Sequence, residues 1–162
     1  MRLIIEERHA TRASRENLWR LLDELSLWPQ WDPYIVSLQR ADDVDSSRSQ
    51  AWVPGARWDE RVRRGPFTPR FRMTVSGITP GYYVEWTTRY LGVRVTHGWG
   101  SEERPDDPLS PRNSVSRETF SAPAPLIWIA RPLFRLFRLF RVRRMTQRSL
   151  RALAQRAETL GP

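Results

Sequence analysis

The side chain best suited to acid–base chemistry in this sequence is His97, because imidazole titrates close to neutral pH. Residues 93–100 alternate in character, which predicts a strand with His97 on its apolar face. Tyr90 and Glu60 are predicted on the same face of neighbouring strands, and Glu60 or Glu7 could orient the imidazole if the strands bring them together. The candidate catalytic residues are therefore His97, Tyr90 and Glu60. The alternative is a half-exposed strand histidine bonded to a neighbour, and the sequence leaves both readings open.

The composition removes several other kinds of chemistry. The chain has no Cys, its histidines are His9 and His97, and no carboxylate cluster has ligand spacing, so we expect neither a metal site nor a cofactor. All 27 basic residues are Arg, which leaves no Lys for a Schiff base or a phosphate loop. Neither a Gly-x-Ser-x-Gly motif nor a Gly-rich phosphate loop occurs.

An apolar interior is predicted around the polar candidates. A small-molecule site needs a mostly apolar lining with a few placed polar groups. The inward faces of the predicted strands supply such a set, which consists of Trp58, Phe71, Met73, Val75, Trp86, Tyr90, His97 and Trp99. The alternative is that these side chains fill a core with no room for a ligand.

The pattern of elements predicts an α+β fold. A strand over residues 3–11 is followed by a helix that Ser14 caps, and by a short helical turn between Trp28 and Pro33. Alternating segments then predict six further strands, over 34–40, 56–64, 70–78, 82–90, 93–100 and 113–120. A curved antiparallel sheet of about seven strands with one apolar face needs a cover, and the long C-terminal helix is the element left to supply it. We expect one domain over residues 1–162.

Most of the net charge of +9 lies in the last part of the chain. Residues 131–162 carry nine Arg and one Glu, and their apolar stripe rotates near Val142, so the two halves of this helix should face different surroundings. We interpret residues 126–144 as a lid, a homodimer surface or a contact with an anionic membrane. The residues proposed for that contact are Arg135, Arg138, Arg141, Phe134 and Phe137. A solvated helix face is the alternative, and no nucleic-acid motif is present.

The N-terminus shows no signal peptide, since Glu6 and Glu7 follow the first apolar residues at once. The longest uncharged run near the C-terminus is too short to span a bilayer. We therefore expect a cytoplasmic protein with, at most, peripheral membrane association.

Several local motifs resemble the START/Bet v 1-like (SRPBCC) superfamily, which includes polyketide cyclase/dehydrase and lipid-transport proteins. In the opening residues, 13–23, a small residue and a helix cap precede Leu18-Trp19, and the Trp28–Pro33 corner follows. Further similarity lies at residues 54–57, 77–80 and 84–86 and in the closing helix at 150–153. The resemblance covers roughly residues 3 to 160 and implies the helix-grip fold, in which the sheet wraps around the long helix and encloses a cavity.

The resemblance and the predicted interior together indicate binding of a hydrophobic small molecule, such as a lipid, an isoprenoid or a polyketide-like compound. One alternative is a cyclase or dehydratase in which His97 deprotonates a carbon next to a carbonyl. Another is a membrane-associated lipid chaperone that docks through the Arg-rich helix. The sequence does not decide whether the protein is an enzyme.

Overall fold

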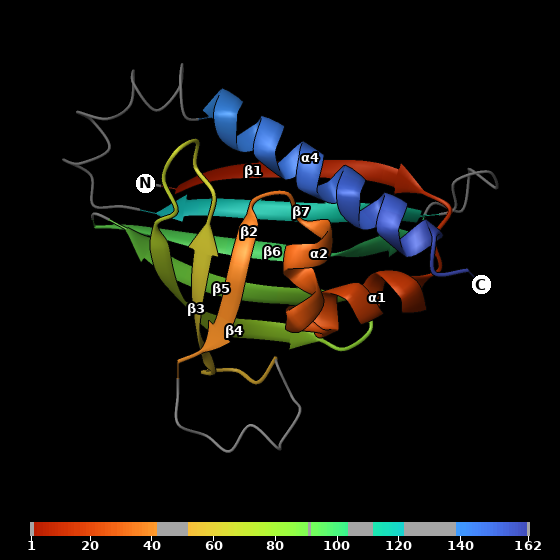
Figure 1. The fold of residues 1–162 in the computed structure, drawn as a ribbon, viewed down its shortest axis with the longest axis horizontal. Helices are drawn as coiled ribbons and strands as arrows, with labels where there is room; N and C mark the ends of the chain where they lie inside the picture. The colour runs from red at the N-terminus through yellow and green to blue at the C-terminus, as the bar shows by residue number, and fades with distance from the viewer. Residues whose placement is uncertain (1, 42–51, 91, 104–111, 122–138, 162) are drawn as a thin grey trace.

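A computed structural model of the chain describes residues 2–41, 52–90, 92–103, 112–121 and 139–161. The elements are β1 (Arg2–Thr11), α1 (Arg15–Asp23), the 3₁₀ turn η1 (Leu25–Leu27), α2 (Trp28–Trp31), β2 (Ile35–Arg40), β3 (Arg57–Val62), β4 (Arg70–Thr79), β5 (Tyr83–Tyr90), β6 (Val93–Glu103), β7 (Arg112–Ser121) and α4 (Leu139–Glu158) (Figure 1).

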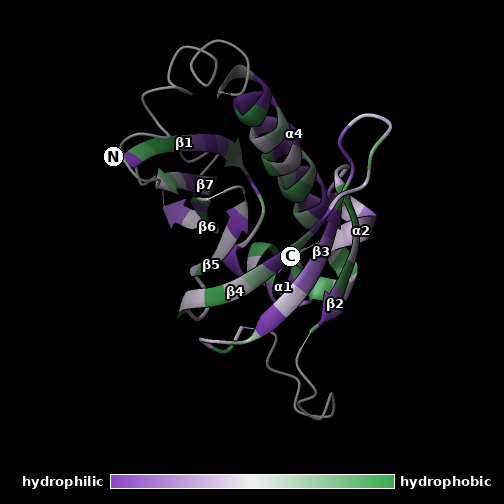
Figure 2. Ribbon diagram, turned by 90° about the vertical axis from the view of Figure 1, so that its left-hand side faces the viewer, coloured by the Kyte–Doolittle hydropathy of each residue, from purple (hydrophilic) through white to green (hydrophobic). Residues whose placement is uncertain are grey.

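The strands form one seven-stranded antiparallel sheet in the order β1-β7-β6-β5-β4-β3-β2. Strands β2 to β6 each pair with the next strand in the sequence, whereas β1 pairs with β7, the last strand. The sheet curves from β1 around to β2, with α4 inside the curve (Figure 2). The predicted fold, a sheet of about seven strands gripping a C-terminal helix, is confirmed.

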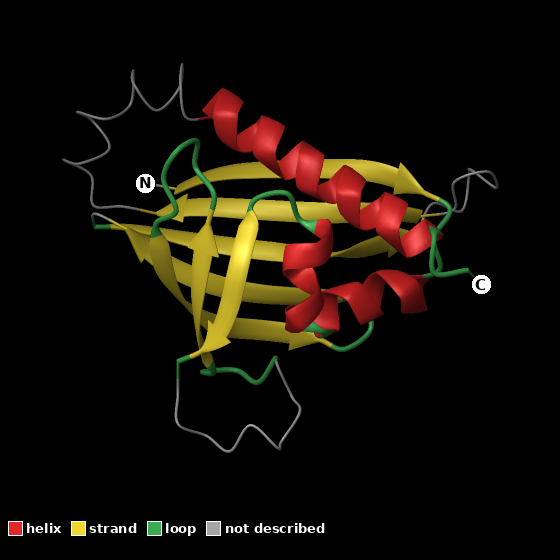
Figure 3. Ribbon diagram, viewed as in Figure 1, coloured by secondary structure: helices red, strands yellow, loops and turns green. Residues whose placement is uncertain are grey.

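The helices begin and end where local chemistry favours it. The side chain of Ser14 accepts a hydrogen bond from the backbone N–H of Asn17, which caps α1 as predicted. Pro29 lies near the start of α2, where backbone N–H groups have no partner within the helix. Its missing N–H therefore costs no hydrogen bond. The two short helices lie against one end of the concave face, and α4 crosses the other side of it (Figure 3).

Helix α4 packs on the sheet through the apolar stripe that the sequence predicted for its second half. Leu150, Leu153 and Ala157 are buried, while Arg144 and Arg151 on the other side are exposed. The expected continuation of the helix back to residue 131, and with it most of the predicted lid, lies outside the described residues.

Hydrogen bonds to carboxylates join α4 to β1 and the residue that follows it, near both ends of the helix. Glu158 at the end of the helix accepts hydrogen bonds from Thr11 Oγ1 (2.8 Å) and from the backbone N–H of Arg12 (2.9 Å). Near its start, Arg143 and Gln147 both donate to Glu7 of β1, at 2.5 and 2.9 Å. The helix therefore has a fixed rotation over the sheet.

A cluster of tryptophans fills the end of the concave face beside α1 and α2. The ring of Trp28 lies 5.4 to 5.9 Å, centroid to centroid, from the rings of Trp31, Trp52, Trp86 and Trp99. The indole N–H groups of Trp28 and Trp52 both donate to the carbonyl of Leu22, so this buried polar pair is satisfied. The cluster joins the short helices to the middle of the sheet.

No helix within the described ranges is long and apolar enough to cross a membrane.

Replacing Trp28 by Ala should lower the free energy of unfolding by about 3–5 kcal/mol, because it leaves a cavity among the other rings. Urea denaturation followed by fluorescence or circular dichroism measures this change. The matched control is Phe67→Ala, since Phe67 is 72% exposed and its removal should change stability by less than about 0.5 kcal/mol. Equal effects of the two substitutions would contradict this account of the core.

Candidate functional site

The sheet register brings the predicted histidine into a row of inward-facing residues. Trp86 on β5 lies opposite His97 on β6, and His97 lies opposite Glu118 on β7. Glu118 accepts a hydrogen bond from Thr146 Oγ1 of α4 at 2.8 Å, so this row lies on the face that the helix covers. The next row along the strands contains Thr88, Val95, Phe120 and Leu3, on the same face.

The predicted ligand-contact residues divide into two groups along the concave face. Met73, Val75, Trp86 and Trp99 are buried in the core that the tryptophan cluster forms. Trp58, Phe71 and His97 are half-buried, as are Val95 and Phe120 of the adjacent row. Of Tyr90 the structure describes the backbone, at the end of β5, but not the side chain.

His97 is held in its neutral form by its surroundings. Its ring stacks on that of Trp86, with centroids 5.5 Å apart and an interplanar angle of 16°. Burial lowers the pKa of His97 below its ordinary value of 6.5, and the charge of Glu118 opposes this shift only in part. At neutral pH the imidazole is therefore a base that can accept a proton.

Glu118 is the carboxylate nearest to that imidazole among the described ion pairs, and sequence reasoning missed it. Its Oε1 atom lies 3.9 Å from His97 Nδ1, which is an electrostatic contact rather than a hydrogen bond. Glu7, which the sequence offered as an orienting group, is instead engaged by Arg143 and Gln147. Residues 113–118 carry polar side chains on both faces, so no alternation marked Glu118 as an inward residue.

Glu60 on β3 is the second titratable group of the site. It is buried, and this burial raises its pKa from 4.5 to about 7, with a further contribution from the negative charges of Asp32 and Glu118. Arg64 opposes the shift. At neutral pH a substantial fraction of Glu60 is therefore protonated and can donate a hydrogen bond, which an ionised carboxylate cannot do.

Several buried polar atoms have no hydrogen-bond partner among the described residues. They are the hydroxyl oxygens of Thr88 and Ser116 and the indole nitrogens of Trp31 and Trp86. A buried polar atom without a partner costs roughly 1–3 kcal/mol unless water or a ligand satisfies it. Thr88, Ser116 and Trp86 are on the rows that contain and flank His97, so this region combines unused hydrogen-bonding capacity with apolar surface.

The described residues include no group of three or more His, Cys, Asp or Glu that could hold a metal ion. Of the residues proposed for membrane or partner contact, Arg141 is exposed in the first turn of α4. Phe134, Arg135, Phe137 and Arg138 lie outside the described residues.

Comparison with known proteins identifies the fold. The sequence matches no protein-family model and no curated protein. Among solved structures, the di-domain ARO/CYC StfQ from the steffimycin biosynthetic pathway superposes with a TM-score of 0.72 and 14% identity, over 98% of this chain and 52% of its own. The Zhui aromatase/cyclase from a Streptomyces species superposes with a TM-score of 0.68 and 13% identity, over 98% of this chain and 94% of its own length.

Norcoclaurine synthase from Thalictrum flavum, in complex with dopamine and hydroxybenzaldehyde, has a TM-score of 0.62 and 14% identity, over 99% of this chain and 86% of its own. The chain spans about half the length of the di-domain proteins. It has the helix-grip fold that these solved structures share, as its local motifs indicated.

Replacing Glu60 by Gln should change how stability depends on pH. Between pH 4.5 and about 7 the folded state retains a proton that the unfolded chain releases, so the free energy of unfolding falls as pH rises. A shift of this size corresponds to roughly 3 kcal/mol. Urea denaturation should therefore show that the wild type loses about this much free energy of unfolding between pH 5 and pH 8. The Gln variant should not show this loss.

Glu158→Gln provides a control of opposite sign. Hydrogen bonds from Arg12 and Thr11 lower the pKa of Glu158. The carboxylate therefore stabilises the folded state at a pH above the pKa of Glu158 in the unfolded chain, and this stabilisation is lost as pH falls. This variant should lose more stability at neutral pH than in acid. If both variants changed the pH profile in the same direction, the assignment of a protonated Glu60 would be wrong.

Proposed function

We propose that the protein binds a hydrophobic small molecule on the concave face, at the end away from the tryptophan cluster. The observation that carries this proposal is the arrangement around His97. Half-buried apolar side chains, such as Phe71, Val95 and Phe120, occur there together with the buried hydroxyl group of Thr88, which has no hydrogen-bond partner among the described residues. An apolar lining with a few oriented polar groups is the usual composition of a small-molecule site.

The polar groups suggest the chemistry of the ligand. A neutral imidazole can accept a hydrogen bond, a protonated Glu60 can donate one, and the hydroxyl of Thr88 can do either. An apolar molecule bearing carbonyl or hydroxyl oxygens would satisfy these groups. A polyketide-like compound, an isoprenoid or a lipid with an oxygen-bearing end has this character. The aromatase/cyclases that share the fold are consistent with such a ligand, although the likeness itself concerns the fold.

Filling this region should weaken binding without unfolding the protein. Val95 points to the concave face between Thr88 and Phe120, whereas its neighbour Thr96 points to the outer face between Thr87 and Thr119. Val95→Phe should weaken binding of the uncharged dye N-phenylnaphthylamine by at least about tenfold, the loss expected when one buried side-chain contact is replaced by a clash. Thr96→Phe adds the same ring on the opposite face and should bind the dye like the wild type.

Native mass spectrometry of the purified protein complements this titration, since a tightly bound apolar molecule would co-purify with the wild type and not with Val95→Phe. Dye binding that is unchanged in Val95→Phe would place the ligand elsewhere and contradict the proposal.

A second candidate function is that of a cyclase or dehydratase, favoured by the neutral His97 beside Glu118. In this reaction a nitrogen of His97 removes a proton from the carbon next to a carbonyl, and the electron pair of that C–H bond moves toward the carbonyl oxygen as an enolate forms. Protonated Glu60 is suited to donate a hydrogen bond to that oxygen, which stabilises the developing charge. Glu118 stabilises the imidazolium that results.

This second candidate predicts exchange of deuterium from heavy water into the acidic C–H position of benzoylacetone, followed by NMR. His97→Gln should reduce the protein-dependent rate by about 100-fold or more, as is typical for loss of a general base. Because the pKa of His97 is lowered, the rate should stay high as pH falls to 6.5 and decline only below it. His9→Gln, at the other histidine, is the control and should exchange at the wild-type rate. Equal rates for His97→Gln and the wild type would exclude this role.

A further inference from the structure

The loop between β3 and β4 presents an aromatic side chain to solvent on a rigid turn. The backbone N–H of Arg64 donates to the carbonyl of Phe67 at 2.7 Å, and the N–H of Phe67 donates back to Arg64 at 3.3 Å. Gly65 has a φ of +65°, which closes this tight turn together with Pro66. Phe67 is 72% exposed, more than the other large hydrophobic side chains of the described residues. The loop extends past the end of β3 (Figure 2).

Arginines surround the base of this loop. Arg61, Arg63, Arg64, Arg70 and Arg72 are all exposed, and the carboxylate within this group is that of Asp59, which already binds Arg70 and Arg72. Arg61 lies directly opposite Arg70 in the register, and further along the same outer face Arg89 lies opposite Arg94. Like charges directly across a strand pair are destabilising, so the folded protein carries unfavourable charge repulsion that an anionic partner would relieve.

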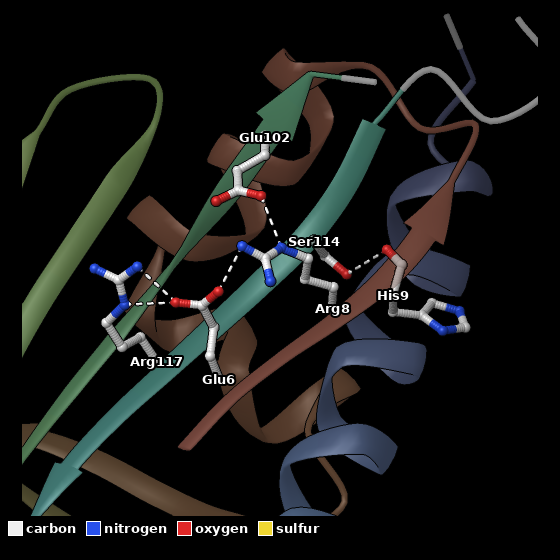
Figure 4. Close-up of polar contacts among 6 residues, drawn as sticks. All are labelled: Glu6, Arg8, His9, Glu102, Ser114 and Arg117. Carbon is white, nitrogen blue, oxygen red and sulfur yellow. Dashed lines mark hydrogen bonds and ion pairs between the residues drawn. The ribbon is translucent and has the colours of Figure 1, made fainter. Parts of the chain in front are cut away.

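The outer face at the other end of the sheet is different. There Glu6 binds Arg8 and Arg117, and Arg8 also binds Glu102, so basic and acidic groups are balanced (Figure 4). Several other carboxylates, namely Glu7, Asp32, Glu60 and Glu118, are buried and contribute little charge to the surface. The excess positive charge of the sheet is therefore concentrated beside the β3–β4 loop.

We propose that residues 63–69 dock the protein on an anionic lipid bilayer, with Phe67 entering the interface and the surrounding arginines contacting the lipid headgroups. An apolar tip with basic residues set behind it is the distribution that interfacial binding requires. The four tip residues 66–69 are uncharged, and three of them, Pro66, Phe67 and Pro69, are apolar, while Thr68 carries the one side-chain hydrogen-bonding group of the tip. This composition suits a lipid interface better than the reading of nucleic-acid bases. Because the turn is already formed, little conformational entropy is lost when the tip inserts.

The docking site and the proposed ligand site lie close together, although the inference does not depend on the ligand. The guanidinium of Arg64 lies 5.4 Å from the ring centre of Phe71, which is one of the half-buried residues of the concave face. A protein bound through this loop would turn that end of the concave face toward the membrane.

The test is co-sedimentation of the full chain with vesicles of phosphatidylcholine alone and of phosphatidylcholine mixed with phosphatidylserine. The wild type should bind the mixed vesicles in a salt-sensitive manner and the neutral vesicles weakly. Phe67→Ala should weaken binding to the mixed vesicles about tenfold. The double variant Arg61→Gln/Arg63→Gln should weaken it roughly thirtyfold, since each arginine near an anionic surface contributes separately.

Two matched controls separate the loop from the remainder of the molecule. Arg20→Gln/Arg156→Gln removes the same charge from α1 and the last turn of α4, and Val53→Ala trims an exposed apolar side chain at the opposite end of β3. Both should bind vesicles like the wild type, and all four variants should keep the wild-type circular dichroism spectrum and dye binding.

Vesicle binding that survives both Phe67→Ala and Arg61→Gln/Arg63→Gln would overturn the inference, as would equal binding to neutral and anionic vesicles. Tight binding of a DNA or RNA oligonucleotide that depends on Arg61 and Arg63 but not on Phe67, without vesicle binding, would also overturn it and identify a nucleic-acid surface instead.

Discussion

The packing of Trp28 against four other indoles is the interaction on which the arrangement of helices and sheet depends. The partner rings come from α2, from the segment before β3, and from the adjacent central strands β5 and β6. One side chain thus connects the short helices to the middle of the sheet, and burial of so much aromatic surface is a large favourable contribution. Because the cluster fills one end of the concave face, the other end is where the interior polar groups and half-buried apolar residues remain.

The distribution of carboxylates determines the character of both faces of the sheet. Glu7 and Glu118 bind α4, Asp32 accepts a hydrogen bond from the backbone of Tyr34, and Glu60 is buried beside them. Burial raises the pKa of Glu60, and the charges of Asp32 and Glu118 add to this shift. Because these acids lie inside, the outer surface beside the β3–β4 loop carries more arginines than carboxylates. The buried polar groups of the concave face and the basic outer surface therefore have one cause, which is that these acids lie on the inner side of the sheet.

The sequence predicted the elements well because their signals are local. The alternation of residues 70–78 and the capping residue Ser14 each describe a single segment, and the structure confirms both. The surroundings of His97 could not be predicted in the same way, because they depend on which residue of β7 lies opposite it. The strand pattern placed Trp86 and Trp99 on the inner face of the sheet. It could not show that both rings pack against Trp28, because Trp28 belongs to a separate helix. The opposition of Arg61 and Arg70 likewise depends on register, which no single segment encodes.

The pairing of β1 with β7 affects how the chain folds during synthesis. Strands β2 to β6 each pair with the strand that is made next, but residues 2–11 pair with residues 112–121. At about 5–20 residues per second the ribosome needs several seconds to tens of seconds to supply that partner. During this interval β1 has no strand partner, and its charged residues, among them Arg2, Glu6 and Arg8, disfavour pairing with another strand.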